Sequence, residues 1–408
     1  MGINCRKWKN LWILSAAELL AMSLWFSASA VVPQLRLEWQ LTGAVQSWLT
    51  MSVQIGFVIG AMASGLLNLA DRLSLQRLFA VSAFLGAIFN GIIAVAIDSP
   101  EPALLMRFLT GVTLAGIYPP GMKLMATWCK EDRGLGIGLL VGALTIGSAL
   151  PHLLNAIPFF SGSEGLASWR TVLLVASLAA LFAAGIAEWF VKSGPFLARA
   201  KKFNWYYASS IFTNRAVRLA NFAYLGHMWE LYAMWTWIPL CLLESYQQAG
   251  WNQIWARLAG FFVVASGGFS CVLAGILADR WGRTTIASIS LIVSGSCCLV
   301  VGFFFNSPFW LTVVCLIWGI AVVADSAQFS AAISELSDPR YVGTALTMQT
   351  SLGFLLTLFS IRTIPPLVEA FGWQWAFSIL ATGPIFGIFN LFKLRKLPEA
   401  IKMASGHR

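Results

Sequence analysis

The sequence has few charged residues and no long polar segment. Only 11% of its 408 residues are charged, whereas 58% are hydrophobic, and soluble domains carry about 25% charged residues. This composition excludes an ordinary soluble enzyme or binding domain and is typical of a polytopic membrane protein. No stretch between the hydrophobic runs is long enough for the nucleotide-hydrolysing domain of an ATP-driven pump.

The sequence also has no recognisable catalytic or metal-binding motif. It contains no Walker motif, no nucleophile elbow, no HExxH and no cluster of metal ligands. The cysteines form no CxxC pair and have no histidine at ligand spacing, so we interpret them as small apolar packing residues; they are Cys5, Cys129, Cys241, Cys271, Cys297, Cys298 and Cys315. We therefore expect neither an enzyme nor a cofactor or metal site.

Twelve long hydrophobic runs make up most of the sequence. Each run reaches the ~20 residues that span a bilayer as a helix. The first run has no small-residue cleavage site after a short core, which predicts a retained helix and not a cleaved signal peptide. The twelve runs cover residues 11–33, 43–69, 75–97, 101–128, 134–159, 169–191, 218–243, 254–278, 284–306, 308–335, 341–368 and 372–392.

The positive charges are distributed unevenly about these runs. If both termini lie on one side of the membrane, nearly all the basic residues lie on that side too. The exceptions are three residues on the opposite side (Arg36, Arg170, Arg257) and three within the hydrophobic runs (Arg107, Lys123, Arg362). The positive-inside rule then places both termini in the cytoplasm, with the chain crossing a bacterial-type inner membrane. Topology thus accounts for the net charge of +10, and a nucleic-acid partner is not indicated.

The two halves of the chain repeat each other. The pattern E-L-x-A-M-x-x-W begins at Glu18 and again at Glu230, an offset of 212, and Asp71 and Asp279 each precede an arginine at an offset of 208. This predicts an all-α protein of two six-helix bundles, residues 1–191 and 218–408, joined by a cytoplasmic linker over 192–217. Parallel repeats of this kind place a substrate site near mid-membrane between the halves.

Each E-L-x-A-M-x-x-W copy puts a carboxylate inside a membrane run. A charge there costs at least ~2.5 kcal/mol in lipid, so we expect Glu18 and Glu230 to face protein or a wet cavity. Helical spacing predicts that Met22 and Trp25 share the face of Glu18, and that Met234 and Trp237 share the face of Glu230. Both faces are expected to line one cavity, where a carboxylate exchanges protons with its surroundings. The alternative is that each Glu pairs with a backbone group or a cation and only locks helices.

Four more residues are candidates for contact with protons or cargo. His227 lies three residues before Glu230, and Tyr118 opens a Tyr-Pro-Pro-Gly segment that is expected to bend its helix and to line the cavity. Asp325 is expected to be a second proton carrier, the partner of a substrate cation or a helix-locking acceptor. Arg107 is expected to pair with an anionic substrate or a carboxylate, or to snorkel to the outer interface.

Paired glycines mark close helix contacts. They occur in the second, fifth and eighth runs, which are therefore candidates for a sliding contact between the halves; the pairs are Gly56 and Gly60, Gly138 and Gly142, and Gly267 and Gly268.

These features resemble the major facilitator superfamily of secondary transporters. Gly275–Arg283 matches that family's loop motif G-x-x-x-D-R-x-G-R, and Arg107 with Gly111 resembles its R-x-x-x-G signature. Gly116–Lys123 resembles nitrate/nitrite- and cyanate-type permeases, although the arginine pair of a nitrate site is absent. The resemblance implies a conformational latch in the loop motif and its degraded first copy, formed by Asp71, Arg72, Gly275, Asp279, Arg280 and Arg283.

The expected function is secondary active transport by alternating access. We expect a monomer in the lipid bilayer that moves a small solute, an anion, with coupling to protons. One alternative is a proton-driven exporter of amphipathic compounds such as a drug or siderophore. Another, from a different class, is a non-transporting membrane sensor, since a fold does not fix a function.

Overall fold

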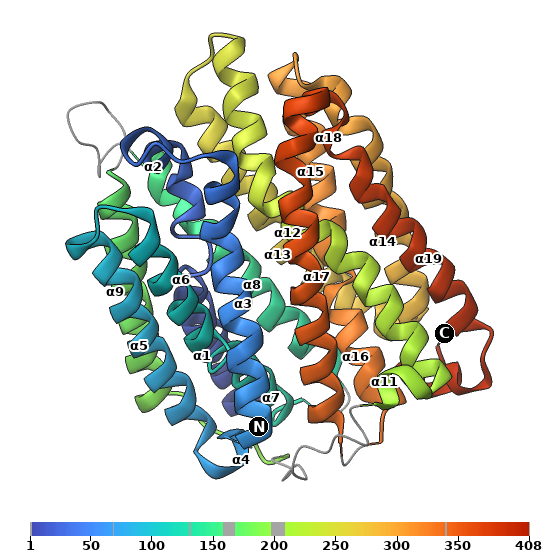
Figure 1. The fold of residues 1–408 in the computed structure, drawn as a ribbon. Coiled ribbons are helices and arrows are strands. Elements are labelled where there is room, and N and C mark those ends of the chain that lie inside the picture. Colours follow the sequence, from blue (N-terminus) through green and yellow to red (C-terminus); the bar gives the residue numbers. More distant parts are fainter. Residues whose placement is uncertain are drawn as a thin grey trace.

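The computed structural model describes residues 2–67, 69–129, 132–157, 168–196, 209–338 and 341–407. The elements of this described part are all helical. Figure 1 shows two helical bundles side by side, the first half of the chain in blue to green and the second in yellow to red, with the N- and C-termini towards the same end. The middle of the predicted linker, residues 197–208, lies outside the described residues, and the exact bundle boundaries stay a prediction.

The helices follow the predicted runs closely. Those of the first half are α1 (Gly2–Met22), η1 (Ser29–Val31), α2 (Val32–Glu38), α3 (Gly43–Leu67), α4 (Leu69–Arg72), α5 (Leu75–Ala96), α6 (Pro100–Leu114), α7 (Tyr118–Ala126), α8 (Arg133–Ala156) and α9 (Trp169–Trp189). Those of the second half are α11 (Ser210–Thr213), α12 (Arg215–Gln248), α13 (Gln253–Trp281), α14 (Arg283–Val300), η3 (Val301–Phe304), α15 (Pro308–Ala324), α16 (Ser326–Leu336), α17 (Val342–Phe371), α18 (Trp373–Ala376), η4 (Ser378–Ala381), α19 (Thr382–Arg395) and η5 (Pro398–Gly406).

Nine helical segments of the described chain are long and apolar enough to cross a membrane. The other three predicted spans coincide with α1, with the pair α6–α7 and with α12. Polar residues lower the apolar character of α1 and α12, and a break divides the fourth span. The arrangement is that of a multi-pass membrane protein with twelve spans.

The fourth and tenth spans are both broken midway. α6 ends at Leu114 and α7 begins at Tyr118, while α15 and α16 meet at Asp325. The starts of α7 and α16 are 208 residues apart, the offset of the two aspartates noted above, so the break belongs to the internal repeat. The first amide groups of a helix have no acceptor within the helix. Because Pro119 and Pro120 carry no amide hydrogen, α7 can begin here with few unpaired donors.

The first span is also broken, which the sequence did not reveal. α1 ends at Met22, and residues 23–28 form turns. Arg107 donates to the backbone oxygens of Leu24 and Trp25, which draws these carbonyls out of a helical ladder. The prediction that Trp25 shares a helix face with Glu18 is therefore wrong, whereas the second copy of the motif lies entirely within α12.

Glycines bring the two halves into contact along α8 and α13. A Cβ added at Gly142 would lie 2.6 Å from the Gly268 oxygen, and one at Gly138 would lie 2.9 Å from the Cys271 oxygen. The glycines predicted for the second span act differently, because Gly56 and Gly60 pack against α6 within the first half. The second span meets the other half through Gln54, which accepts a hydrogen bond from Thr357 on α17.

Replacing Gly319 with alanine should destabilise the protein. A Cβ at Gly319 of α15 would overlap the Val263 oxygen of α13, just as one at Gly111 of α6 would overlap the Val53 oxygen of α3. Overpacking costs about 1–3 kcal/mol, so the melting temperature of the purified protein in detergent should fall. Gly343→Ala is the control, because nothing lies within 4 Å of a Cβ there; equal shifts in the two variants would contradict the helix contact.

Candidate functional site

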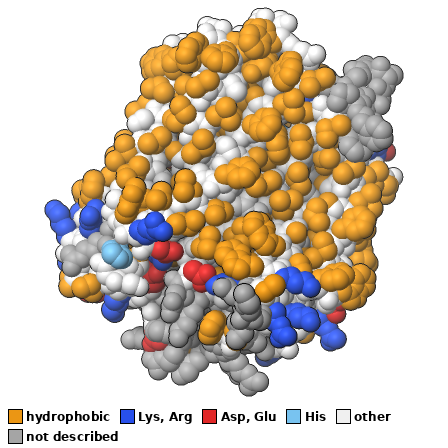
Figure 2. Space-filling view, turned by 180° about the vertical axis from the view of Figure 1, so that it is seen from behind, with side chains coloured by type: hydrophobic (Ala, Val, Ile, Leu, Met, Phe, Trp, Pro, Cys, Tyr) orange, Lys and Arg blue, Asp and Glu red, His pale blue; other side chains and the backbone are white. Residues whose placement is uncertain are grey.

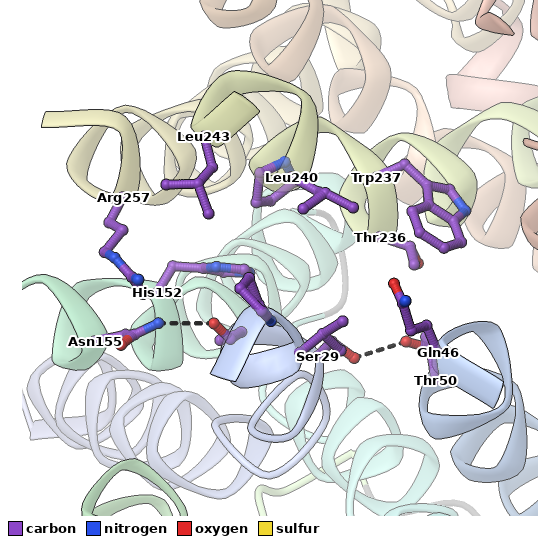
Figure 3. A pocket seen from close by; sticks show the side chains of 14 residues that line it. Ser29, Gln46, Thr50, His152, Asn155, Thr236, Trp237, Leu240, Leu243 and Arg257 are labelled. Carbon is purple, nitrogen blue, oxygen red and sulfur yellow. Dashed lines mark hydrogen bonds between the residues drawn. The ribbon is translucent and has the colours of Figure 1, made fainter. Parts of the chain in front are cut away.

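A small cavity lies between the two halves, towards the end of the molecule opposite the termini. Figure 3 shows side chains from both halves pointing into it. Its volume is about 40 Å³, which has room for water but not for an organic solute, so the halves are nearly closed around it. The first half contributes Ser29, Ala30, Val32, Pro33, Gln46, Thr50, His152 and Asn155, and the second contributes Thr236, Trp237, Pro239, Leu240, Leu243 and Arg257.

Most polar groups of this cavity are held by other protein groups. Ser29 and Thr50 share a hydrogen bond of 2.6 Å between their hydroxyls, and Asn155 donates to the Ala30 oxygen at 2.8 Å. The Trp237 indole donates to the Ile361 oxygen at 3.0 Å. The cavity is therefore preorganised, and few of its donors remain available to a ligand.

Arg257 is the exception. It extends from the first turns of α13 toward His152 (Figure 3) and is 9% exposed. Its Nε has no hydrogen-bond partner, and it forms no ion pair with a residue in the described ranges. A buried cation without a counter-ion is costly, so this arrangement suits an anionic ligand whose apolar part contacts Trp237, Leu240 and Leu243.

Of the five residues expected to line a cavity, Trp237 lies among the lining residues here, whereas Met22, Trp25, Tyr118 and Met234 do not. Arg257 and His152 were missed as candidates, because each lies near the outer end of its run. The distribution of charge could have indicated Arg257, since it is one of three basic residues on the side of the membrane where basic residues are rare.

Glu18 lies on α1. Its side chain is fully buried, and neither carboxylate oxygen has a hydrogen bond to a residue that the structure describes. It packs against the first turn of α7, where a Cβ added to Gly121 would lie 2.7 Å from Oε2. Glu18 is thus a buried acid without a hydrogen-bond donor, next to the break in the fourth span.

Glu230 has a very different environment. It accepts hydrogen bonds from Ser294 Oγ at 3.0 Å, from Cys298 Sγ at 3.3 Å and from the Trp318 indole. These partners come from α14 and α15, so Glu230 is held inside the second half. The expectation that both acids line one chamber is not met in this conformation, since neither lines the cavity.

His227 and Asp325 form a buried pair in the second half. His227 Nδ1 lies 2.9 Å from Asp325 Oδ1, and its Nε2 lies 2.9 Å from the Ser326 hydroxyl. Both side chains are buried at the break between α15 and α16. The partner of Asp325 in this conformation is thus a histidine of the protein.

Arg107 is fully buried and does not reach the lipid interface. Besides the two carbonyls of the first span, it donates to Ser27 Oγ at 3.1 Å, to Asn90 Oδ1 at 3.3 Å and to the Leu49 oxygen at 3.4 Å. The snorkelling alternative is therefore wrong, and all these acceptors are neutral. Arg107 organises the broken first span.

The loop motif of the second half touches the first half. A Cβ added to Gly134, at the start of α8, would lie 2.6 Å from Asp279 Oδ1, and one at Gly275 would lie 2.6 Å from the Gly134 oxygen. A carboxylate at a helix N-terminus is favoured electrostatically. Arg283 joins Asp279 at 3.0 Å and Glu335 at 2.8 Å.

Two of the remaining latch candidates, Arg72 and Arg280, are exposed. The side chain of Asp71, the other candidate, lies outside the described residues. The halves are therefore joined at the end of the molecule that carries the termini, while the cavity lies at the other.

Two helical bundles with repeated helix breaks, a cavity between them and a contact at one end are the architecture of transporters built from internal repeats. The chain belongs to the Major Facilitator Superfamily, whose family model matches residues 14–361 and 221–406. Membership of this family agrees with the expectation of a transporter and not an enzyme.

Three relatives share 26% identity with the chain. They are a probable 4-methylmuconolactone transporter of Cupriavidus pinatubonensis (280 residues, 67% of this chain), a gallate transporter of Pseudomonas putida (307 residues, 67%) and a 3-(3-hydroxy-phenyl)propionate transporter of Escherichia coli (253 residues, 61%). The match spans 62%, 66% and 59% of their respective lengths.

A solved structure shares the whole fold. The proton:xylose symporter XylE bound to 6-bromo-6-deoxy-D-glucose superposes with a TM-score of 0.75, covering 96% of each chain at 14% identity. At this identity the likeness establishes the fold alone, and it confirms the predicted fold class.

Proposed function

We propose that this protein transports a small organic anion, a carboxylate attached to a ring, across the membrane by alternating access with coupling to protons. The observation that carries the proposal is Arg257, a buried cation in a cavity between the two halves that has no counter-ion among the residues that the structure describes. Two of the relatives are named for transporting gallate and a hydroxyphenyl propionate, and both compounds contain a carboxylate and an aromatic ring.

The contacts between the halves support a rocking motion. Asp279 and the glycines of α8 and α13 join the halves at the end that carries the termini, and the cavity lies at the opposite end. Figure 2 shows Lys and Arg gathered towards the end that carries the termini. By the positive-inside rule that end faces the cytoplasm, so the cavity is the outward-facing part of the pathway.

Glu18 is the proposed proton carrier. A charged carboxylate without a partner is costly in a buried site, so gain or loss of a proton at Glu18 changes the energy of this closed conformation. A proton bound there therefore links the membrane pH gradient to the movement of the halves. Glu230, which already has three donors, is better suited to holding helices together.

Uptake into proteoliposomes tests the proposed function. The panel is benzoate, 4-hydroxybenzoate, gallate, hexanoate and xylose, each with and without a pH gradient. We expect accumulation of carboxylates that depends on the gradient, and no uptake of xylose. Absence of carboxylate flux across the panel, or efflux of cationic dyes in its place, would contradict the proposal and favour the exporter alternative.

A further inference from the structure

A cluster of six aromatic rings fills the boundary between the halves beside the cavity. We call Trp25, Phe26, Phe57, Tyr232, Trp235 and Phe354 the aromatic cluster. Ring centroids lie 5.1 Å apart for Trp25–Phe57, 5.2 Å for Trp25–Phe354, 6.2 Å for Phe26–Tyr232 and 5.4 Å for Tyr232–Trp235. The first three rings belong to one half and the last three to the other, so separation of the halves must part them.

The cluster lies on the same elements as the cavity, although none of its rings lines the cavity in this conformation. Phe26 lies just before the lining residue Ser29, and Trp235 directly precedes the lining residues Thr236 and Trp237. On α3, Phe57 lies two turns beyond Thr50. The cluster is therefore the closed part of the boundary between the halves that follows the cavity along these helices.

Two indole donors inside the cluster have no acceptor among the described residues. Nε1 of Trp25 and Nε1 of Trp235 lack a hydrogen-bond partner there, and the two residues are 0% and 1% exposed. A buried indole N–H normally finds an acceptor, as those of Trp237, Trp318 and Trp373 do here. The two unsatisfied donors come from opposite halves of the protein.

A third donor lies nearby. The Gln54 side chain accepts from Thr357 with its oxygen, but its Nε2 has no partner. Gln54 is fully buried and lies on α3 between Thr50 of the cavity and Phe57 of the cluster. The boundary between the halves thus combines flat apolar rings with buried hydrogen-bond donors that need acceptors.

One helix contact connects the cluster to Arg257. Trp235 and Pro239 are four residues apart on α12, a rise of about 6 Å. Pro239 packs against Gly260, where an added Cβ would lie 3.3 Å away, and Gly260 is about one turn from Arg257 on α13. The cation and the unpaired indole of Trp235 therefore lie on two helices that pack against each other.

We propose that the aromatic cluster opens to form the ring subsite of the cargo. The cargo ring stacks between rings of the two halves, and its oxygen substituent accepts from the Trp25 and Trp235 indoles. This inference rests on the proposed function and deepens it, because it narrows the cargo to carboxylates with an oxygen-substituted planar ring. The two tryptophans then determine specificity, while Arg257 binds the charge.

Competition among three acids tests the subsite. In proteoliposomes, kcat/KM is measured for 4-hydroxybenzoate, benzoate and hexanoate in wild-type protein and in Trp25→Phe, Trp235→Phe and Trp25→Leu. The phenylalanine variants keep a ring and lose the N–H, so the preference for 4-hydroxybenzoate over benzoate should fall about tenfold, the effect of one hydrogen bond. Trp25→Leu should lower the preference for benzoate over hexanoate.

The matched control is Trp310→Phe, an exposed tryptophan on α15, which should leave both ratios unchanged. Carboxylate flux without any preference for rings, or ratios unaltered by the phenylalanine variants, would overturn the subsite and leave the proposed function standing. No carboxylate flux in wild-type protein would overturn both. If Trp25→Leu does not fold, the two phenylalanine variants still decide the question.

Discussion

Replacing Arg257 with glutamine should abolish the transport of organic anions, with a fall in kcat/KM of about 100-fold or more. Arg257 lies between the halves with its Nε unpaired, so the cargo carboxylate is its expected partner. Loss of one partner from a buried charge pair costs 2–5 kcal/mol, and each 1.4 kcal/mol is about tenfold. The measurement is carboxylate counterflow in proteoliposomes, which needs no pH gradient.

Two further variants make this result specific. Arg257→Lys keeps the charge but loses the planar fork that binds a carboxylate through two nitrogens, so its activity should lie between those of wild type and glutamine. Arg362→Gln is the control, because Arg362 is an exposed arginine of another membrane run and lines a separate groove. Counterflow that survives in Arg257→Gln, or falls equally in Arg362→Gln, would refute the anion site.

The sequence was sufficient to predict the fold because each span is encoded locally. Hydrophobic runs fix the spans, and the offsets between Asp71 and Asp279 and between the two E-L-x-A-M-x-x-W copies reveal the repeat. The helix break at Tyr118 could be predicted locally, because Pro119 and Pro120 follow it directly. The break at Asp325 has no such local signal, but it lies one repeat away from Tyr118.

The candidate site was harder to predict because it depends on contacts between distant segments. The break after Met22 follows from Arg107, whose donors reach carbonyls more than eighty residues earlier in the chain. Arg257 and His152 meet because α8 and α13 pack together across the halves. Each residue looks like an ordinary span end when its own run is considered alone.

The two acids show the same limit. Glu18 and Glu230 occupy matching positions of one repeated pattern, so sequence reasoning assigned them one role. The structure separates them, because Ser294, Cys298 and Trp318 surround only Glu230. These three residues lie in later spans, and the sequence around Glu230 gives no indication that they contact it. The functional roles of both acids stay predictions.

Glutamine substitution should therefore change a different property at each acid: proton coupling at Glu18 and stability at Glu230. Glu18→Gln removes no hydrogen bond, so the variant should fold normally. It has no proton to exchange, so accumulation driven by a pH gradient should vanish while counterflow of the same carboxylate persists. Glu230→Gln places an amide NH₂ among three donors, which should cost about 1–3 kcal/mol of stability and lower the melting temperature of the purified protein.

Both measurements on both variants are needed to read the result. If Glu18 carries the proton, loss of coupling and loss of stability must fall on different residues. Gradient-driven accumulation that survives in Glu18→Gln but vanishes in a well-folded Glu230→Gln would reverse the assignment, because it would mean that the donors around Glu230 part during the transport cycle. The unpaired Glu18 would then need another explanation, such as a partner that it meets only when the halves rock to expose the opposite side of the membrane.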